Sequence, residues 1–306
     1  MPASIVKQVV DLHRAQLQGI IELGGVRKVR KLYEQARAEL EDKLSELKKA
    51  GKDTTFTAHH ARMVLLQVRD GLSQFQQQFV PALAKQGKAS ATLAQRHTVS
   101  AIKKFESRFT GTQPVLQIEE AGVFARVYRG IEPSLLDRYH KYTRNYPLPT
   151  IKRIRNNLAM SMIKNEGVQQ AVDRIAGAGG IFARERWRAE RICRTEMQYA
   201  YGASHQRCLE ETAQEVPRLM KRLVATFDER TGDDSKVLNG QTVPFDKPFV
   251  WMKQSKLGAV RVEYMQPPNR PNDRECVIPW RADYHSRAVE AGPVEPTMPS
   301  GIEVGG

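Results

Sequence analysis

Apolar residues recur every three or four positions over long stretches of the N-terminal part, a spacing that places them on one face of an α-helix. The first stripe ends before Gly51 and consists of Val26, Val29, Tyr33, Ala36, Leu40, Leu44 and Leu47. The second begins near Thr57 and consists of Ala61, Leu65, Val68, Leu72, Phe75, Phe79 and Leu83. Because only a short polar turn separates the two stripes, the pattern predicts two long helices packed as an antiparallel pair.

Helical spacing is less regular over the middle of the chain. Glycines and prolines interrupt residues 110–150, which predicts a connector that contains one short helix. Further helices are expected at about 102–109, 134–145, 150–165, 167–176 and 183–214. The glycine cluster at 176–180 lacks the Gly-Lys-Ser/Thr ending of a phosphate-binding loop and follows no predicted strand. We therefore interpret this cluster as a hinge.

Beyond Pro217 the pattern changes to short apolar runs bounded by turn residues. Strands are expected at about 218–227, 241–245, 260–264 and 277–280. Asn239 and Gly240 form a dipeptide typical of a tight turn before a returning strand. The expected fold class is therefore α+β: a mainly α-helical N-terminal two thirds with long antiparallel helices, a small C-terminal β-containing module and an extended tail.

The net charge of +14 is unevenly distributed, with +16 carried by residues 1–226 and −2 by residues 227–306. A basic surface attracts polyanions, but a solvated helical surface has the same composition, so both interpretations stay open. The three cysteines are spread along the chain and suit a reducing compartment. No apolar run approaches the roughly 20 residues of a spanning helix, and the N-terminus does not resemble a signal peptide. We therefore expect a cytoplasmic protein without a membrane partner.

Four short motifs in a fixed order give the most specific indication of function. They are Arg191-Ile-Cys-Arg-Thr-Glu196, Asp228-Glu-Arg-Thr231, Leu238-Asn-Gly240 and Pro271-Asn-Asp-Arg274. In this order they resemble the C-terminal module of the phage Mu F-like minor head proteins, also called head morphogenesis proteins, over about residues 150–282. The motif residues that the resemblance marks as structural are Arg191, Arg194, Thr195, Glu196, Asp228, Arg230, Thr231, Gly240 and Pro271.

The resemblance implies a structural, non-enzymatic virion protein of low copy number that assembles near the portal of a tailed phage. The implied partners are the portal protein, the major capsid protein or both, and double-stranded DNA bound without sequence specificity. Its location would be the virion head, after synthesis in the host cytoplasm, and it would be multimeric only in the assembled particle. The expected divisions are a long-helix region at 1–110, a connector and helical region at 111–182, a Mu F-like module at 183–282 and an extended or disordered tail at 283–306.

Many members of that family carry cysteines and histidines after the second and fourth motifs, a layout that suits a metal ion. Here Thr231 is followed by Gly-Asp-Asp-Ser, and Cys276 is the only thiol beside the fourth motif. The resemblance therefore implies that the turns are kept without a metal. We expect neither a metal nor another cofactor.

The helix expected at 183–214 carries a row of arginines on one face, which is typical of phosphate binding. These candidate DNA-contacting residues are Arg184, Arg188 and Arg191. The same helix offers carboxylates for ion pairs with them: Glu185, Glu190 and Glu196. We favour the ion-pair interpretation and expect Arg194 and Glu196 to anchor this helix to the β unit.

Two functional classes compete with a structural role. A free-standing basic nucleic-acid-binding protein would use the positive helices and the arginine row. A metal-dependent nuclease would use the carboxylates between Asp228 and Asp234 with magnesium, although their spacing is not that of an EF-hand. His205 and Cys208 lie three residues apart, a spacing that places a nucleophile and its base on one face of a helix, but the sequence offers no orienting partner. We therefore expect no catalytic residues.

Overall fold

The computed structural model confirms the α+β fold class, with long helices up to Thr212 followed by a small antiparallel β module. The described residues are 2–51, 54–112, 114–116, 121–177, 179–226, 228–229, 231–255, 258–271 and 273–284. The tail expected at 283–306 lies outside the described residues, apart from Asp283 and Tyr284.

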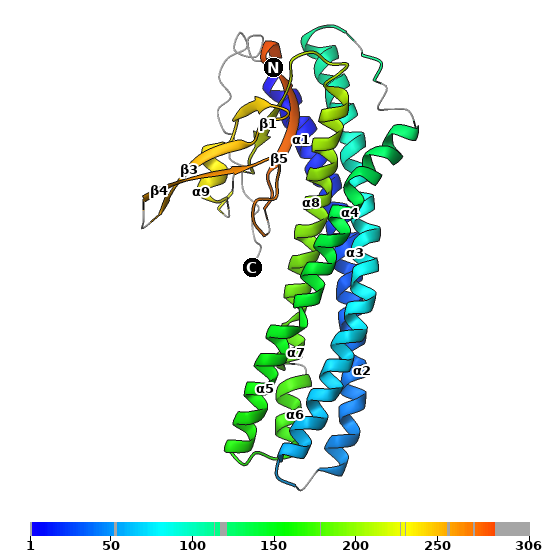
Figure 1. Cartoon of the computed structure of the whole chain (residues 1–306), viewed down its shortest axis with the longest axis vertical. Coiled ribbons are helices and arrows are strands. Elements are labelled where there is room, and N and C mark those ends of the chain that lie inside the picture. Colours follow the sequence, from blue (N-terminus) through cyan, green and yellow to red (C-terminus); the bar gives the residue numbers. More distant parts are fainter. Residues whose placement is uncertain are drawn as a thin grey trace, which may run out of the picture. The chain divides into compact units, whose positions relative to one another are not determined.

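Helices account for most of the chain before the β module (Figure 1). Their bounds are α1 Pro2–Gly19, the π-helix η1 Ile20–Val26, α2 Arg27–Ala50, α3 Ala58–Phe109, α4 Ala121–Asn145, α5 Pro147–Ile163, α6 Val168–Ala176, α7 Ile181–Arg184 and α8 Arg186–Thr212. Helix α2 ends as predicted, with Gly51 as its C-cap, and α3 begins directly after Thr57. None of the helices within the described ranges has the length and apolar character needed to cross a bilayer.

Two breaks predicted in the helical region are wrong. The helix expected at 102–109 is the C-terminal part of α3, which runs for 52 residues and contains Pro81. The connector expected at 110–150 is helical from Ala121 onward, and α4 contains Pro133. A proline inside a helix removes one backbone hydrogen bond. Phe79 and Leu83 are nevertheless buried on either side of Pro81, so burial of the apolar face outweighs that local cost.

The chain forms two compact units, and each is assembled from separate stretches. Unit 1 comprises Met1–Leu17, Ala91–Arg129 and Tyr201–Gly306. Unit 2 comprises Gln18–Ser90 and Gly130–Ala200. Helices α3, α4 and α8 each contribute residues to both units.

The apolar stripes predicted on α2 and α3 form much of the core of unit 2. All of their residues are buried except Leu47 and Leu65. Lys43 forms an ion pair with Asp70, whereas Tyr33 meets the edge of Phe75 with ring centroids 5.2 Å apart. In these two contacts the later residue of α2 meets the earlier residue of α3, so the two helices run in opposite directions (Figure 1). This confirms the predicted antiparallel pair.

Unit 1 contains the β module. Its elements are β1 Leu219–Val224, α9 Asp233–Leu238, β2 Thr242–Pro244, β3 Phe249–Ser255, β4 Gly258–Tyr264 and β5 Cys276–Arg281. Strands β2, β1 and β5 form one antiparallel sheet in that order, and β3 and β4 form a second, two-stranded sheet. Helix α9 and strand β3 were not predicted. Gly240, at φ +82°, leads from α9 into β2 rather than joining two consecutive strands.

Apolar clusters join the module to the helices of unit 1. One cluster packs the aromatic residues Phe105 and Phe109 of α3 against Trp280 of β5 and against Tyr284. Another lies within the module and consists of Leu223, Leu238, Phe249 and Val277. The module therefore has a packed core of its own, built from both sheets and α9.

Candidate functional site

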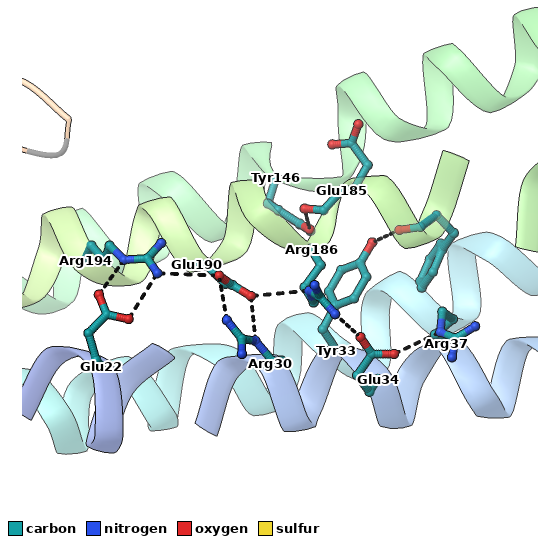
Figure 2. A network of polar contacts seen from close by, with 11 residues as sticks. Glu22, Arg30, Tyr33, Glu34, Arg37, Tyr146, Glu185, Arg186, Glu190 and Arg194 are labelled. Carbon is teal, nitrogen blue, oxygen red and sulfur yellow. Dashed lines mark hydrogen bonds and ion pairs between the residues drawn. The ribbon is translucent and has the colours of Figure 1, made fainter. Parts of the chain in front are cut away.

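A ladder of arginines and glutamates connects α8 to η1 and α2 within unit 2 (Figure 2). Its central residue is Glu190, whose side chain is 8 % exposed. Arg30 binds the two carboxylate oxygens of Glu190 at 3.0 and 3.3 Å. Arg194 binds the two oxygens of Glu22 at 2.7 and 3.1 Å and also lies 3.6 Å from Glu190. The first motif thus contributes Arg194 to a continuous set of ion pairs.

The ladder continues along α2 through Glu34. Arg186 lies 3.3 Å from Glu190 and donates to Glu34 at 2.6 Å, while Arg37 donates to the other oxygen of Glu34 at 2.9 Å. Burial opposes ionisation of Glu34, but the hydrogen bonds from Arg186 and Arg37 outweigh it and lower the pKa of this carboxyl. The ladder therefore keeps the Glu34 carboxylate charged and holds three helical elements together.

Glu196 forms a separate buried pair with Arg138 of α4. The Glu196 side chain is 1 % exposed, and the guanidinium binds its two oxygens at 3.0 Å each. The guanidinium also lies over the ring of Tyr199, 3.6 Å from its centroid. Burial raises the pKa of Glu196, while the hydrogen bond and charge of Arg138 oppose that rise. This bidentate pair links α8 to α4 within unit 2.

Glu185, in the short junction between α7 and α8, has the same role toward α5. Its side chain is 2 % exposed and forms an ion pair with Arg153 and a 3.2 Å hydrogen bond from Thr150. The Tyr146 hydroxyl donates to the Glu185 carbonyl at 3.1 Å. All three carboxylates proposed for ion pairing are therefore paired in the structure.

The expectation that Arg194 and Glu196 anchor their helix to the β unit is wrong. Their partners, Glu22 and Arg138, lie on η1 and α4, so both residues hold helix to helix. Sequence spacing could not identify these partners, because they lie far away along the chain. The hydroxyl of Thr195 donates a hydrogen bond within its own helix, to the carbonyl of Arg191 at 2.9 Å.

The candidate DNA-contacting arginines do not share one open surface. Arg184 is exposed and donates to the Gly179 carbonyl at 2.9 Å. Arg188 is partly buried and donates to the Tyr146 carbonyl at 3.2 Å. Arg191 is also partly buried, with its guanidinium 4.7 Å from the ring centroid of Trp187. Their contact with DNA stays a prediction.

In unit 1, the structure brings the second and fourth motifs together. Asp228 receives a hydrogen bond from Arg274 at 2.6 Å, and Thr231 accepts the backbone N–H of Asp228 at 2.9 Å. Asp234 pairs with Arg270, which also bonds Ser235 at 2.6 Å. Two arginines of the 266–274 loop thus hold the segment that leads into α9.

Of the other motif residues of the module, Gly240 and Pro271 lie in turns, and Arg230 lies outside the described residues. The N–H of Gly240 donates to the carbonyl of Leu223 at 2.8 Å. Pro271 occupies an exposed turn in the loop that carries Arg270 and Arg274. Arg230 lies outside the described residues, so its predicted role is not addressed by the structure.

The acidic residues considered for magnesium face different partners. Asp228 and Asp234 are held by separate arginines, and the fully exposed Asp233 pairs with Lys236 at 3.3 Å. Across the described ranges, no group of three or more His, Cys, Asp or Glu side chains could hold a metal ion. Cys276 is buried, and burial raises the pKa of its thiol.

Three buried histidines form a second polar cluster, which the sequence did not predict. The rings of His13 on α1 and His97 on α3 stack with centroids 3.8 Å apart. His97 lies 2.8 Å from the Tyr201 hydroxyl through Nδ1 and 2.6 Å from the Gln16 amide oxygen through Nε2. This arrangement suits a neutral ring, with Nε2–H as donor and Nδ1 as acceptor.

His205 on α8 completes this cluster and does not activate Cys208. Its Nδ1 lies 2.6 Å from the hydroxyl of Thr98, and its buried Nε2 has no hydrogen-bond partner within the described part of the chain. Burial raises the pKa of Cys208 far above its ordinary value, so its thiol stays protonated. A nucleophile needs the thiolate, so this pair lacks the chemistry of a cysteine enzyme.

The histidine cluster links the stability of unit 1 to pH. Burial lowers the pKa of His97 to about 4. Burial, with smaller contributions from neighbouring basic groups, lowers the pKa of His13 to about 2 and that of His205 to about 3. The unfolded chain binds these protons near the ordinary value of about 6.5. The contribution to stability is therefore complete above about pH 6.5 and declines as pH falls toward 4.

Searches of family models, curated proteins and solved structures each gave no match to this chain. Its function therefore has to follow from its residues and their geometry. Most of the motif residues lie in two structural constellations, the Arg–Glu pairs of unit 2 and the ion-paired turns of the β module. In both places the charged groups neutralise one another.

Proposed function

We propose that this chain is a structural minor head protein of a tailed phage, which binds the portal or capsid vertex during head assembly. Its C-terminal β module would dock on the portal or the major capsid protein. Its basic helices would face the packaged DNA. The protein would act by binding, without catalysis or a cofactor, and would become multimeric only through its symmetric partner.

The observation that carries the proposal is the pairing of the second and fourth motifs through Asp228 and Arg274, with the Asp234–Arg270 pair directly beside them. These motifs carry the resemblance to Mu F-like proteins, and here they form one ion-paired unit. A catalytic site usually leaves a charged or nucleophilic group open to its substrate. In this module Arg274 and Arg270 instead pair with Asp228 and Asp234, which fits a structural role.

The β3–β4 sheet supports docking by the module. Its only strand pairing within the described residues is between β3 and β4, so each strand has an outer edge without a neighbouring strand. Met252 and Val260 are 56 % and 51 % exposed on these strands. Open edges with apolar side chains are favourable contact surfaces for another protein.

The experiment that tests the proposal is affinity capture of the tagged full-length chain from cells that also express the neighbouring genes. Capture is done after nuclease treatment, at low salt and at about 0.5 M salt, where exposed charges are largely screened. Recovery of a portal or capsid protein at both salt concentrations is the expected result. Recovery of nucleic acid alone in a parallel sample without nuclease, lost at high salt, would refute the proposal.

A free-standing nucleic-acid-binding protein is the second candidate function. The charge of +16 over residues 1–226 favours it. It differs from the first candidate in one measurable respect, because it requires no affinity for a capsid component. Affinity capture therefore separates the two candidates.

A further inference from the structure

The end of α4 and the whole of α5 form a stretch of chain with an unusual charge composition. Between Arg138 and Asn165 there are seven lysines and arginines and no aspartate or glutamate. Arg138 and Arg153 are engaged with Glu196 and Glu185 in unit 2. The other five are all exposed, and four of them are called the basic stripe: Lys141, Arg144, Lys152 and Arg155.

The basic stripe lies along one side of the α4–α5 segment. The buried positions of this segment continue at helical spacing across the junction between the two helices: Tyr139, Thr143, Tyr146, Thr150, Ile154 and Leu158. Tyr146, at the junction, keeps helical backbone angles of φ −59° and ψ −45°. The four stripe residues follow the same helical spacing, but they are offset by half a turn from the buried positions. Leu148 lies on the same side, between Arg144 and Lys152. Its four cations therefore lie opposite the buried face.

The basic stripe differs from the arginines that serve the internal framework. The ion pairs recorded on α4 and α5 use Arg126, Arg138 and Arg153. Within the described ranges, no carboxylate forms an ion pair with any residue of the stripe. Its cations are thus available to an external anion, whereas Arg188 and Arg191 are already engaged with aromatic rings and backbone.

We propose that the basic stripe is the surface through which this protein binds duplex DNA along its phosphate backbone. From Lys141 to Arg155 the stripe extends about 21 Å at 1.5 Å per residue. A duplex carries one charge per about 1.7 Å of its axis, so a line of four cations meets several phosphates at once. Such contacts give affinity without reading base sequence. The stripe itself indicates a phosphate backbone, and the choice of duplex DNA rests on the proposed head function.

An anionic membrane is the rival partner for a basic helix face. Binding to a membrane requires a broad apolar face inserted beside the cations. On this segment the main apolar face, which includes Ile154 and Leu158, is already buried inside unit 2. The exposed large apolar residues between Lys141 and Arg155 are Tyr142 and Leu148, and two separate side chains do not form a broad apolar face. The geometry therefore favours a phosphate backbone over a lipid surface.

The test measures binding of the full-length chain to a short, fluorescently labelled DNA duplex of mixed sequence over a salt series of about 50–200 mM. The stripe variant carries Lys141→Gln, Arg144→Gln, Lys152→Gln and Arg155→Gln. The matched control, with the same charge change on exposed residues of α2 and α3, carries Lys28→Gln, Lys31→Gln, Arg62→Gln and Arg69→Gln. A partial variant with only Lys152→Gln and Arg155→Gln provides a graded response. Circular dichroism of each variant verifies its helical content.

The stripe variant is expected to bind the duplex at least about tenfold more weakly, and the slope of log K against log salt concentration should be smaller in magnitude by about 3–4. For the partial variant the slope should change by about half as much. The control variant is expected to change the slope by less than about 1. Equal weakening in both variants, or no salt-dependent binding by the unmodified chain, would overturn the proposal. Binding to phosphatidylserine vesicles is measured in parallel. A stripe variant that loses vesicle binding but binds DNA as well as the unmodified chain would also overturn the proposal. In affinity capture the stripe variant should still recover portal or capsid protein, so failure here and failure of the proposed function are distinguishable.

Discussion

The buried pair of Arg138 and Glu196 offers the sharpest test of how unit 2 is held together. Replacing Arg138 with methionine leaves the Glu196 carboxylate, 1 % exposed, without its cation. Removal of one partner from a buried pair costs about 3–5 kcal/mol. Because Arg138 is itself 28 % exposed, solvent screens part of the interaction, and we expect a loss of about 2–4 kcal/mol near neutral pH. Urea unfolding followed by far-UV circular dichroism measures this loss.

The pH dependence of that loss has a definite sign. Burial already raises the pKa of Glu196, and removal of Arg138 removes the main opposing influence. A carboxyl whose pKa is raised in the folded state favours folding below its unfolded value, and that advantage disappears as pH rises through the folded value. Arg138→Met should therefore destabilise the protein less at about pH 5 than at about pH 8.

Two further variants decide whether this reasoning holds. The double variant Arg138→Met with Glu196→Met should regain stability to within about 1 kcal/mol of the unmodified chain, because no buried charge is left unpaired. Arg207→Met removes the exposed pairs on the same helix and should cost less than about 1 kcal/mol. A single variant as mild as Arg207→Met, or a double variant as unstable as the single one, would refute the role assigned to the pair.

The remaining predictions concern glycine packing, acid sensitivity and the absence of catalysis. Gly25→Ala would place a Cβ 2.8 Å from the Sγ atom of the buried Cys193 and should lower the unfolding free energy by about 1–3 kcal/mol. Gly19→Ala, where a Cβ meets no atom within 4 Å, should raise the unfolding free energy by up to about 1 kcal/mol in the same urea assay. His97→Gln should reduce the loss of stability on acidification from about pH 6.5 to 4, and an unchanged pH profile by calorimetry would contradict the buried-histidine argument. Purified chain with magnesium should not cleave plasmid DNA; cleavage that Asp233→Ala or Asp234→Ala abolishes would instead establish the nuclease alternative.

Hydrophobic spacing predicted the long helices well because burial of one face leaves a direct trace in the sequence. The stripes on α2 and α3 and the end of α2 at Gly51 follow from local periodicity and capping. The same local reasoning ended the second helix after Leu83 and placed a connector at 110–150, because the apolar stripe weakens or is interrupted by glycine and proline there. It could not weigh the burial of small residues such as Ala91 and Ala94, which continue the packed face of α3. Helix α9 was missed because acidic turn residues are also favourable at a helix start.

The candidate sites were predictable only in part. The sequence identified Glu185, Glu190 and Glu196 as ion-pair residues, since several arginines lie on the same helix. Arginines of the same helix do pair with Glu185 and Glu190, but the arginines that bind both oxygens of Glu196 and Glu190 come from α4 and α2, which the sequence did not predict. The histidine cluster gave no signal at all, as its members are spread over three helices and belong to no short motif.

The sequence alone determined the fold class, the amphipathic helices, the positive charge of residues 1–226 and the order of the four motifs, because each is a property of neighbouring residues or of composition. Tertiary structure decided which charges are neutralised and which stay exposed. Arg194 and Arg138 look no different along the chain from Lys141 or Arg155. Long-range packing supplies a carboxylate to the first two and leaves the other two facing outward, since a charge pair requires proximity in space.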